Sequence, residues 1–203
     1  MISQLVLASG NPGKLREFRA LCAPLGIDIV PQSTFHVIEA DEPHFTFVEN
    51  ALAKARHGSK ATGLPAFSDD SGICVDALSG APGVHSARYA QSATGQLPRG
   101  EQDGRNNAKL IAVLEGESNR RAHYTAVIVM VRHADDPEPL IAEGRWHGEI
   151  IDTPRGEGGF GYDPYFFLPG LNQTAAQLAP EHKNRISHRG VAMSRLLTLL
   201  REA

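Results

Sequence analysis

The chain alternates short apolar runs with glycine-rich or acidic turns, and the spacing within those runs switches between strand and helix periods. An apolar run at 5–7 predicts a buried strand, and a loop follows at 9–14. From Leu15 onward, apolar residues recur every three or four positions, as they do on one face of a helix. A short second strand is expected at 27–30. Strand, tight loop and helix in this order indicate the start of an α/β fold.

A longer helix is predicted over 46–63. Thr46 and Glu49 form a capping-box pattern at its start, and Gly63 is typical of its end. Apolar residues between these positions follow the helical period, and Lys54 lies on the flank of that apolar stripe. Such a lysine either extends to solvent or reaches a buried anion.

After this helix we expect a strand at 65–68 that leads into two aspartates, and a second strand at 73–77. A loop with one helical turn at 80–104 and a helix at 105–114 follow. The chain then predicts two long strands at 121–133 and 139–151 and an amphipathic helix at 190–203. The turn-forming sequence ADDPEP between the long strands favours an antiparallel hairpin. We therefore expect a single α/β domain over 1–203, with a mixed, curved central sheet flanked by helices. This arrangement allows two lobes around a substrate cleft.

Composition excludes several classes of protein. The 203 residues suffice for a stable core without disulfides, so Cys22 and Cys74 are interpreted as small buried thiols. The net charge is −3 and the basic residues are scattered, which disfavours a nucleic-acid partner but allows a small anionic ligand. Without a secretory signal pattern or an apolar stretch of membrane-spanning length, the sequence indicates a cytoplasmic protein with no membrane partner.

The loop SGNPGK, from Ser9 to Lys14, is the first candidate for chemistry. Glycines let the backbone direct N–H groups at an anion, the following helix adds positive potential at its start, and Lys14 reaches a phosphate oxygen. The spacing differs from that of a Walker loop. An ordinary turn is the alternative for this loop taken alone.

Asp69, Asp70, Ser71 and Gly72 form the second candidate. Carboxylates are hard oxygen ligands that suit Mg²⁺, which takes one or two of them together with substrate phosphates. Adjacent strand residues point to opposite faces, so only one of the two aspartates is expected to face the site. A solvated acidic turn is the alternative. The acidic loop offers a second metal carboxylate from Glu39, Asp41 or Glu42, or is simply solvated.

Two further segments combine unusual residue types. Residues 155–170 surround Phe160 with glycines and continue into Tyr162 and Asp163, as in a loop that brings backbone and an aromatic ring close to a flat ligand. A turn packed by aromatics is the alternative. Residues 181–190 gather basic side chains before the last helix, which is typical of a phosphate or carbonyl site, or of a solvated helix start.

Five blocks, SGNPGK, TFVENALAKA, FSDDSGICVDALSGAPGVHSARYA, GGFGYDPYF and HKNRISHRG, together resemble the inosine triphosphate pyrophosphatase family, in the family's order and from residue 5 to about 190. Ser9 replaces a common threonine and keeps its hydroxyl. The acidic loop reads DEPHFTF where bacterial members often read EETGLTF, which leaves the second metal ligand open.

The resemblance implies an elongated α/β homodimer that uses Mg²⁺ to hydrolyse ITP, dITP and XTP to monophosphate and pyrophosphate. It assigns catalysis to Asp70, Lys14 and Lys54. It assigns the metal to Asp70 and Asp41, and Glu42 and Glu39 remain open alternatives to Asp41. It assigns substrate binding to Ser9, Gly10, Asn11, Pro12, Gly13, Lys14, Ser71, Phe160, Gly161, Tyr162, Asp163, Lys183, His188 and Arg189, the last three completing the base pocket.

Two other functions compete with this interpretation. A hydrolase of other nucleotides, such as modified pyrimidine triphosphates, shares the fold, but the GGFGYDP and SHRG blocks favour purines. A non-catalytic nucleotide-binding protein would keep the glycine loop and have no need of Asp70.

Overall fold

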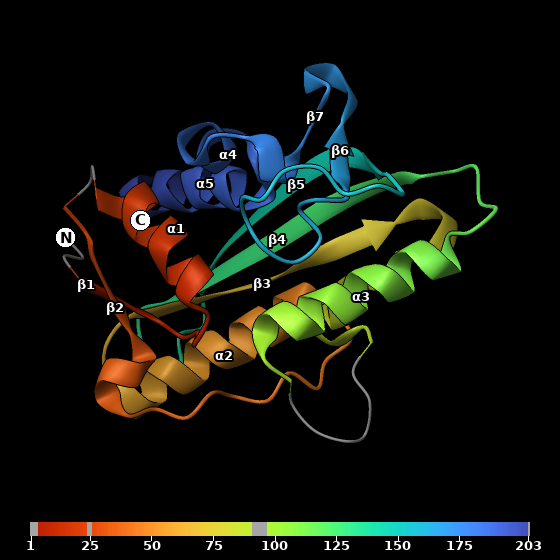
Figure 1. Cartoon of the computed structure of the whole chain (residues 1–203). Helices are drawn as coiled ribbons and strands as arrows, with labels where there is room; N and C mark the ends of the chain where they lie inside the picture. Colours follow the sequence, from red (N-terminus) through yellow and green to blue (C-terminus); the bar gives the residue numbers. More distant parts are fainter. Residues whose placement is uncertain (1–3, 24–25, 91–96, 203) are drawn as a thin grey trace. The chain divides into compact units, whose positions relative to one another are not determined.

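A computed structural model describes residues 4–23, 26–90 and 97–202 (Figure 1). Its strands form one seven-stranded sheet in the order β2-β1-β3-β4-β5-β6-β7. The strands are β1 (Gln4–Leu7), β2 (Asp28–Pro31), β3 (Ala66–Val75), β4 (Arg121–Val131), β5 (Leu140–Ile150), β6 (Phe166–Leu168) and β7 (Gln173–Thr174). β1 pairs in parallel with β2 and β3, whereas β6 pairs antiparallel with β5 and β7. The predicted α/β class with a mixed sheet is confirmed.

The helices are α1 (Pro12–Cys22), α2 (Phe47–Thr62), α3 (Arg99–Val113), α4 (Pro180–Ile186) and α5 (His188–Glu202). Short 3₁₀ turns join the strands and helices: η2 (Gln32–Phe35), η3 (Asp76–Leu78), η4 (Gly83–Arg88), η5 (Pro169–Leu171) and η6 (Ala175–Gln177). None of the described helices combines the length and apolar character that crossing a membrane requires.

The chain divides into two compact units. Unit 1 comprises 1–70, 126–144 and 188–203, and unit 2 comprises 71–125 and 145–187. Each of β3, β4 and β5 begins in one unit and ends in the other.

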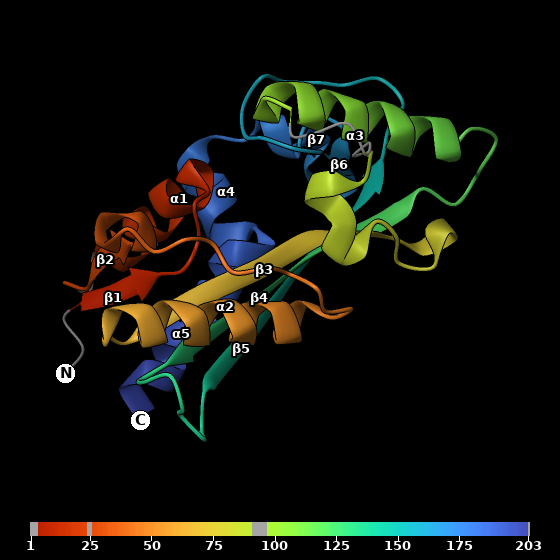
Figure 2. The same cartoon turned by 90° about the horizontal axis from the view of Figure 1, so that it is seen from below.

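Unit 1 has a helix layer on each face of its strands. Alternate residues of β4, such as Ile128 and Met130, pack with Phe18 of α1 and Met193 of α5. The residues between them, Val127, Val129 and Val131, pack with Ala51 and Ala55 of α2. Figure 1 shows α1 and α5 on one side of these strands and α2 on the other, and the view from below in Figure 2 places α2 in front of them.

Unit 2 has an aromatic core. Tyr124 of β4 and Trp146 of β5 contact Phe166 of β6, with ring centroids 4.7 and 5.4 Å from the Phe166 centroid. Leu110 and Leu114 at the end of α3 join the same cluster. This packing anchors the segment that runs into β6, which carries the glycine-rich motif.

Two predicted elements need correction. β3 is one continuous strand, not a strand at 65–68 and another at 73–77, because cations from distant segments neutralise the aspartates and let the pairing continue through them. α3 begins at Arg99, not at 105. The prediction missed its first turns because they are polar and lack an apolar stripe. Within the predicted loop at 80–104, residues 83–88 form a 3₁₀ turn, and 91–96 lie outside the described residues.

The two cysteines are free thiols. Cys22 is buried in the core of unit 1 and Cys74 is half-buried on β3.

Candidate active site

The middle of β3 carries two aspartates that face opposite sides of the sheet. Asp69 is 0% exposed and Asp70 is 5% exposed. Asp69 lies on the same face as Phe67, which packs in the core with α1 and α5, whereas Asp70 faces Asn50 of α2. The two carboxylates therefore have different partners.

Asp69 is the counter-ion of two cations from different helices. Nζ of Lys14, on α1, lies 3.0 Å from its Oδ1, and Nε of Arg189, on α5, lies 3.2 Å from its Oδ2. Arg189 also pairs with Glu17 of α1, with 2.9 Å between Nη1 and Oε2. Burial alone would raise the pKa of Asp69, but Lys14 and Arg189 outweigh it and hold that pKa far below its usual range. Asp69 is thus ionised at all physiological pH values.

Asp70 is bound from α2. Asn50 donates its Nδ2–H to Oδ2 at 3.1 Å, and Nζ of Lys54 lies 3.6 Å from Oδ1. Lys54 also donates to the main-chain oxygen of Asp69 at 3.0 Å and pairs with Glu42 at 2.5 Å. Burial raises the pKa of Asp70 against the opposing charges of Lys54 and Lys14, and the Glu42 carboxylate adds to the rise.

The environments of the two aspartates thus push their pKa values in opposite directions, which is a recurring property of acid–base sites. Asp69 is fixed as a structural anion. Asp70 has the higher proton affinity, so it is the candidate to accept a proton from water. Nearby, burial lowers the pKa of Lys14, whereas for Lys54 the carboxylates of Asp70 and Glu42 outweigh burial and raise the pKa.

The loop from Ser9 to Lys14 joins β1 to α1 and has an anion on its backbone. Asn11 caps α1, because its Oδ1 accepts from the N–H groups of Gly13 at 2.9 Å and Lys14 at 3.3 Å. Gly10 donates its backbone N–H to the Glu39 carboxylate. A carboxylate oxygen at this N–H shows that the exposed loop offers a donor to oxyanions. Pro12 is the first residue of α1 and points no N–H into the loop.

Of the three acids in the loop before α2, the structure brings Glu42, and not Asp41, to the site. Glu42 reaches Lys54, and through it the Asp70 carboxylate. Glu39 contacts the glycine loop instead. Asp41 is exposed, and within the described part of the chain no contact joins it to Asp70.

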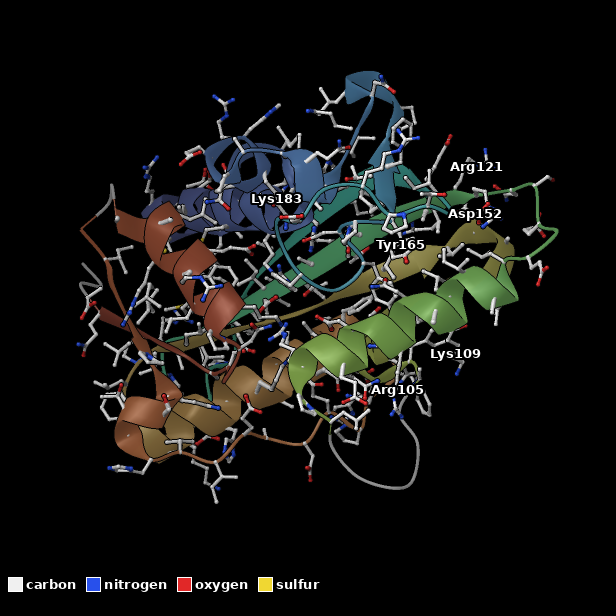
Figure 3. All side chains as sticks on the ribbon, viewed as in Figure 1. Arg105, Lys109, Arg121, Asp152, Tyr165 and Lys183 are labelled. Atoms are coloured by element: carbon white, nitrogen blue, oxygen red, sulfur yellow. The ribbon has the colours of Figure 1, made fainter. Side chains whose placement is uncertain are left out.

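Unit 2 holds the glycine-rich motif through Asp163. Oδ2 of this buried carboxylate accepts from the Phe160 N–H at 2.8 Å and from Nζ of Lys183 at 2.6 Å. Tyr124 donates its hydroxyl to Oδ1 at 3.4 Å. Lys183, on α4 and labelled in Figure 3, also lies 5.3 Å from the centroid of the half-buried Phe160 ring. Asp163 thereby binds both the Phe160 backbone and the Lys183 ammonium group.

The remaining predicted residues have other surroundings. Tyr162 is 4% exposed and donates its hydroxyl to the Ser86 carbonyl at 2.8 Å, so it belongs to the core of unit 2 and not to a surface that frames a base. Ser71 follows Asp70 on β3 and is half-buried. His188 starts α5 in unit 1, where it is 3% exposed. Arg189, also expected beside the base, is held by Asp69.

Sequence reasoning missed four polar residues at helical spacing. Asn50 lies one turn before Lys54 on α2, and Arg99, Asp103 and Asn107 lie at successive turns of α3. Polar side chains recurring at i and i+4 would have been the signal, because residues at this spacing share a helix face.

A glycine loop before a helix, the lysines Lys14 and Lys54, and the carboxylates that pair with them define an α/β protein with a cluster of opposed charges on β3. Comparison with known proteins makes this class specific: the sequence profile of the Ham1 family matches residues 5–199. The chain belongs to the Ham1 family. This confirms the family resemblance seen in the sequence motifs.

Relatives and solved structures agree with this assignment. The chain is 61% identical to the dITP/XTP pyrophosphatase of Ralstonia nicotianae and 64% identical to that of Burkholderia pseudomallei, over 98% of this chain and 96% and 94% of theirs. A HAM1 protein structure from Coxiella burnetii superposes with a TM-score of 0.89 at 46% identity, covering 100% of both chains. The Staphylococcus aureus Ham1 structure gives 0.83 at 37% identity over 98% of each.

Proposed function

We propose that the protein hydrolyses non-canonical purine nucleoside triphosphates, dITP, ITP and XTP, to the nucleoside monophosphate and pyrophosphate, and so keeps these nucleotides out of DNA and RNA. The relatives named above are dITP/XTP pyrophosphatases, and the match covers nearly their whole length. The observation in this chain that carries the proposal is the pair of buried aspartates that face opposite sides of β3, with Lys14 3.0 Å from Asp69 and Lys54 3.6 Å from Asp70.

The triphosphate is assigned to unit 1. The Gly10 backbone N–H, which binds the Glu39 carboxylate, is the group of the loop at 9–14 that we assign to a phosphate oxygen. Lys14 and Lys54 hold their ammonium groups near the Asp69 main-chain oxygen, at 3.3 and 3.0 Å, where they stabilise charge on the reacting phosphoryl group. Asp70 accepts the proton of the attacking water, for which its raised proton affinity suits it.

The charge balance of this cluster supports a divalent cation. Lys14, Lys54 and Arg189 pair with four carboxylates, those of Glu17, Glu42, Asp69 and Asp70, so these ion pairs of the described residues carry no excess positive charge for a triphosphate. Two of these carboxylates, Asp70 and Glu42, converge on the Lys54 ammonium, and such a pair of hard oxygen donors fits Mg²⁺ bound together with substrate phosphates. When bound, Mg²⁺ neutralises phosphate charge and acidifies water. We propose Asp70 and Glu42 as its ligands.

The base is assigned to Phe160, Asp163 and Lys183 of unit 2. The half-buried Phe160 ring offers a face for stacking. Lys183 has three N–H donors, so it can donate to the 6-oxo group of hypoxanthine or xanthine but accepts nothing from the 6-amino group of adenine. A donor facing a donor loses a hydrogen bond and discriminates against ATP.

We also propose that the chain acts in the cytoplasm as a homodimer of single domains spanning 1–203. The strands β3, β4 and β5, shared between the units, support the single domain. Sedimentation velocity tests the dimer.

A substrate panel tests the function. ITP, dITP, XTP, ATP, GTP and dUTP are incubated with Mg²⁺ or with EDTA, and pyrophosphate is measured separately from orthophosphate. We expect metal-dependent pyrophosphate release from ITP, dITP and XTP and little from ATP or GTP. Orthophosphate as the first product, or turnover of dUTP alone, would contradict the proposal.

A further inference from the structure

One face of α3 is directed at the turn that carries Phe160. Arg99, Asp103 and Asn107 lie at i, i+4 and i+8, so they share one side of the helix. Asp103 accepts the N–H of Gly161 at 3.1 Å, and Asn107 donates to the Gly161 carbonyl at 3.0 Å. The guanidinium carbon of Arg99 lies 5.0 Å from the centroid of the Phe160 ring.

These contacts join the turn that carries Phe160 to the helix that carries Arg99. Both main-chain groups of Gly161 are bound to α3, and the Phe160 N–H is bound to Asp163. Two hydrogen bonds therefore join the turn to α3, and the guanidinium of Arg99, at the start of that helix, lies over the ring.

Arg99 differs from the other charged residues around the Phe160 ring in its partners. Lys183 is paired with Asp163 at 2.6 Å, and the Asp103 carboxylate is bound to the Gly161 N–H. Arg99 is exposed, and among the described residues it makes no ion pair, so Phe160 is its contact. Among the described residues, no carboxylate in contact with Arg99 offsets its charge beside the ring.

We propose that Arg99 is a specificity-determining residue that favours XTP over ITP and dITP. This inference rests on the proposed function and on a base that binds beside Phe160. The xanthine ring releases a proton more readily than hypoxanthine, because its second carbonyl group stabilises the anion. A cation at the ring therefore attracts ionised xanthine more strongly than neutral hypoxanthine.

The experiment measures kcat/KM for XTP and for ITP across the pH range in which xanthine ionises, and uses their ratio at each pH. The ratio cancels titrations of the protein that affect both substrates, including those of Asp103, Asp163 and Lys183. Arg99→Gln removes the charge, and Arg99→Lys keeps it. Arg105→Gln is the matched control, because Arg105 is an exposed arginine of the same helix that pairs with Glu101 (Figure 3).

With Arg99→Gln we expect the XTP to ITP ratio to fall by up to about fivefold where xanthine is ionised, the range for a solvent-exposed ion pair, and to match the wild type where xanthine is neutral. Arg99→Lys should retain most of the ratio, and Arg105→Gln all of it. Circular dichroism verifies that each variant is folded.

An XTP to ITP ratio that does not change in Arg99→Gln at any pH would overturn the inference. An equal loss for both substrates at every pH would also overturn it, because that result assigns Arg99 a structural role. If the wild-type protein hydrolyses neither XTP nor ITP, the proposed function fails as well. If the wild type hydrolyses both and only the ratio fails to respond, the proposed function stands without this inference.

Discussion

Neutralising the two adjacent aspartates should change stability in opposite directions. Asp69→Asn and Asp70→Asn are the same isosteric substitution at neighbouring positions of β3, so strand propensity and volume are matched. The difference between the two variants therefore reports the electrostatic environment of each carboxylate.

Asp69→Asn should be strongly destabilising. The change leaves Lys14 without its carboxylate partner in a site where its side chain is 12% exposed, while Arg189 keeps Glu17. Removing one member of a buried ion pair costs about 3–5 kcal/mol. Because Arg189 keeps its contact with Glu17, we expect the free energy of unfolding to fall by about 3 kcal/mol. For a chain of this length, that loss lowers Tm by roughly 6–12 °C.

Asp70→Asn should leave the free energy of unfolding at neutral pH equal to or above that of the wild type. The folded-state pKa of Asp70 is raised, mainly by burial, so the folded state binds its proton more tightly than the unfolded state does. Stability from this group is full below the unfolded pKa and is lost as the pH rises through the folded pKa. For Asp69, whose folded pKa is lowered, stability is present above the unfolded pKa and is lost as the pH falls.

Urea unfolding of the three proteins at neutral pH, followed by circular dichroism, measures the effect. The slope with denaturant should stay constant while the midpoint moves. If Asp70→Asn were destabilised as much as Asp69→Asn, the assignment of separate environments to the two carboxylates would be refuted.

Three further predictions test the site. Glu42→Gln should raise the Mg²⁺ concentration needed for half-maximal activity while Asp41→Asn does not, as measured by metal titration; the reverse order would assign the metal to Asp41. In the metal-free protein the Asp70 carboxyl should titrate above the usual aspartate pKa of about 3.9, as followed by NMR; a pKa at or below that value would remove Asp70 as the base. Gly159→Ala should raise KM for XTP, because Gly159 has φ +76° and a Cβ there would overlap the Asp163 carboxylate; an unchanged KM would separate this turn from base binding.

Local signals in the sequence predicted α2 well. Thr46 Oγ1 accepts the Glu49 N–H at 3.3 Å and Gly63 ends the helix with φ 70°, so both ends depend on residues within one turn. The alternation of apolar side chains on β4 likewise follows from sequence alone. Fold class was predictable because these patterns are short-range.

The partners of the site residues were less predictable because they come from distant segments. The strand continues through Asp69 because Lys14 and Arg189, 55 and 120 residues away, neutralise it, and no local pattern encodes that pairing. The start of α3 was missed because Arg99 and Asp103 lie in polar turns without an apolar stripe. The motifs identified the candidate residues, whereas only the contacts in the structure distinguish the role of Asp69 from that of Asp70.

The decisive measurement is pyrophosphate release from dITP by Asp70→Asn, beside the wild type in the presence of Mg²⁺. We expect a folded protein at least as stable as the wild type that has lost several orders of magnitude in kcat. Wild-type turnover by a folded Asp70→Asn protein would contradict the assignment of Asp70 as the reacting carboxylate.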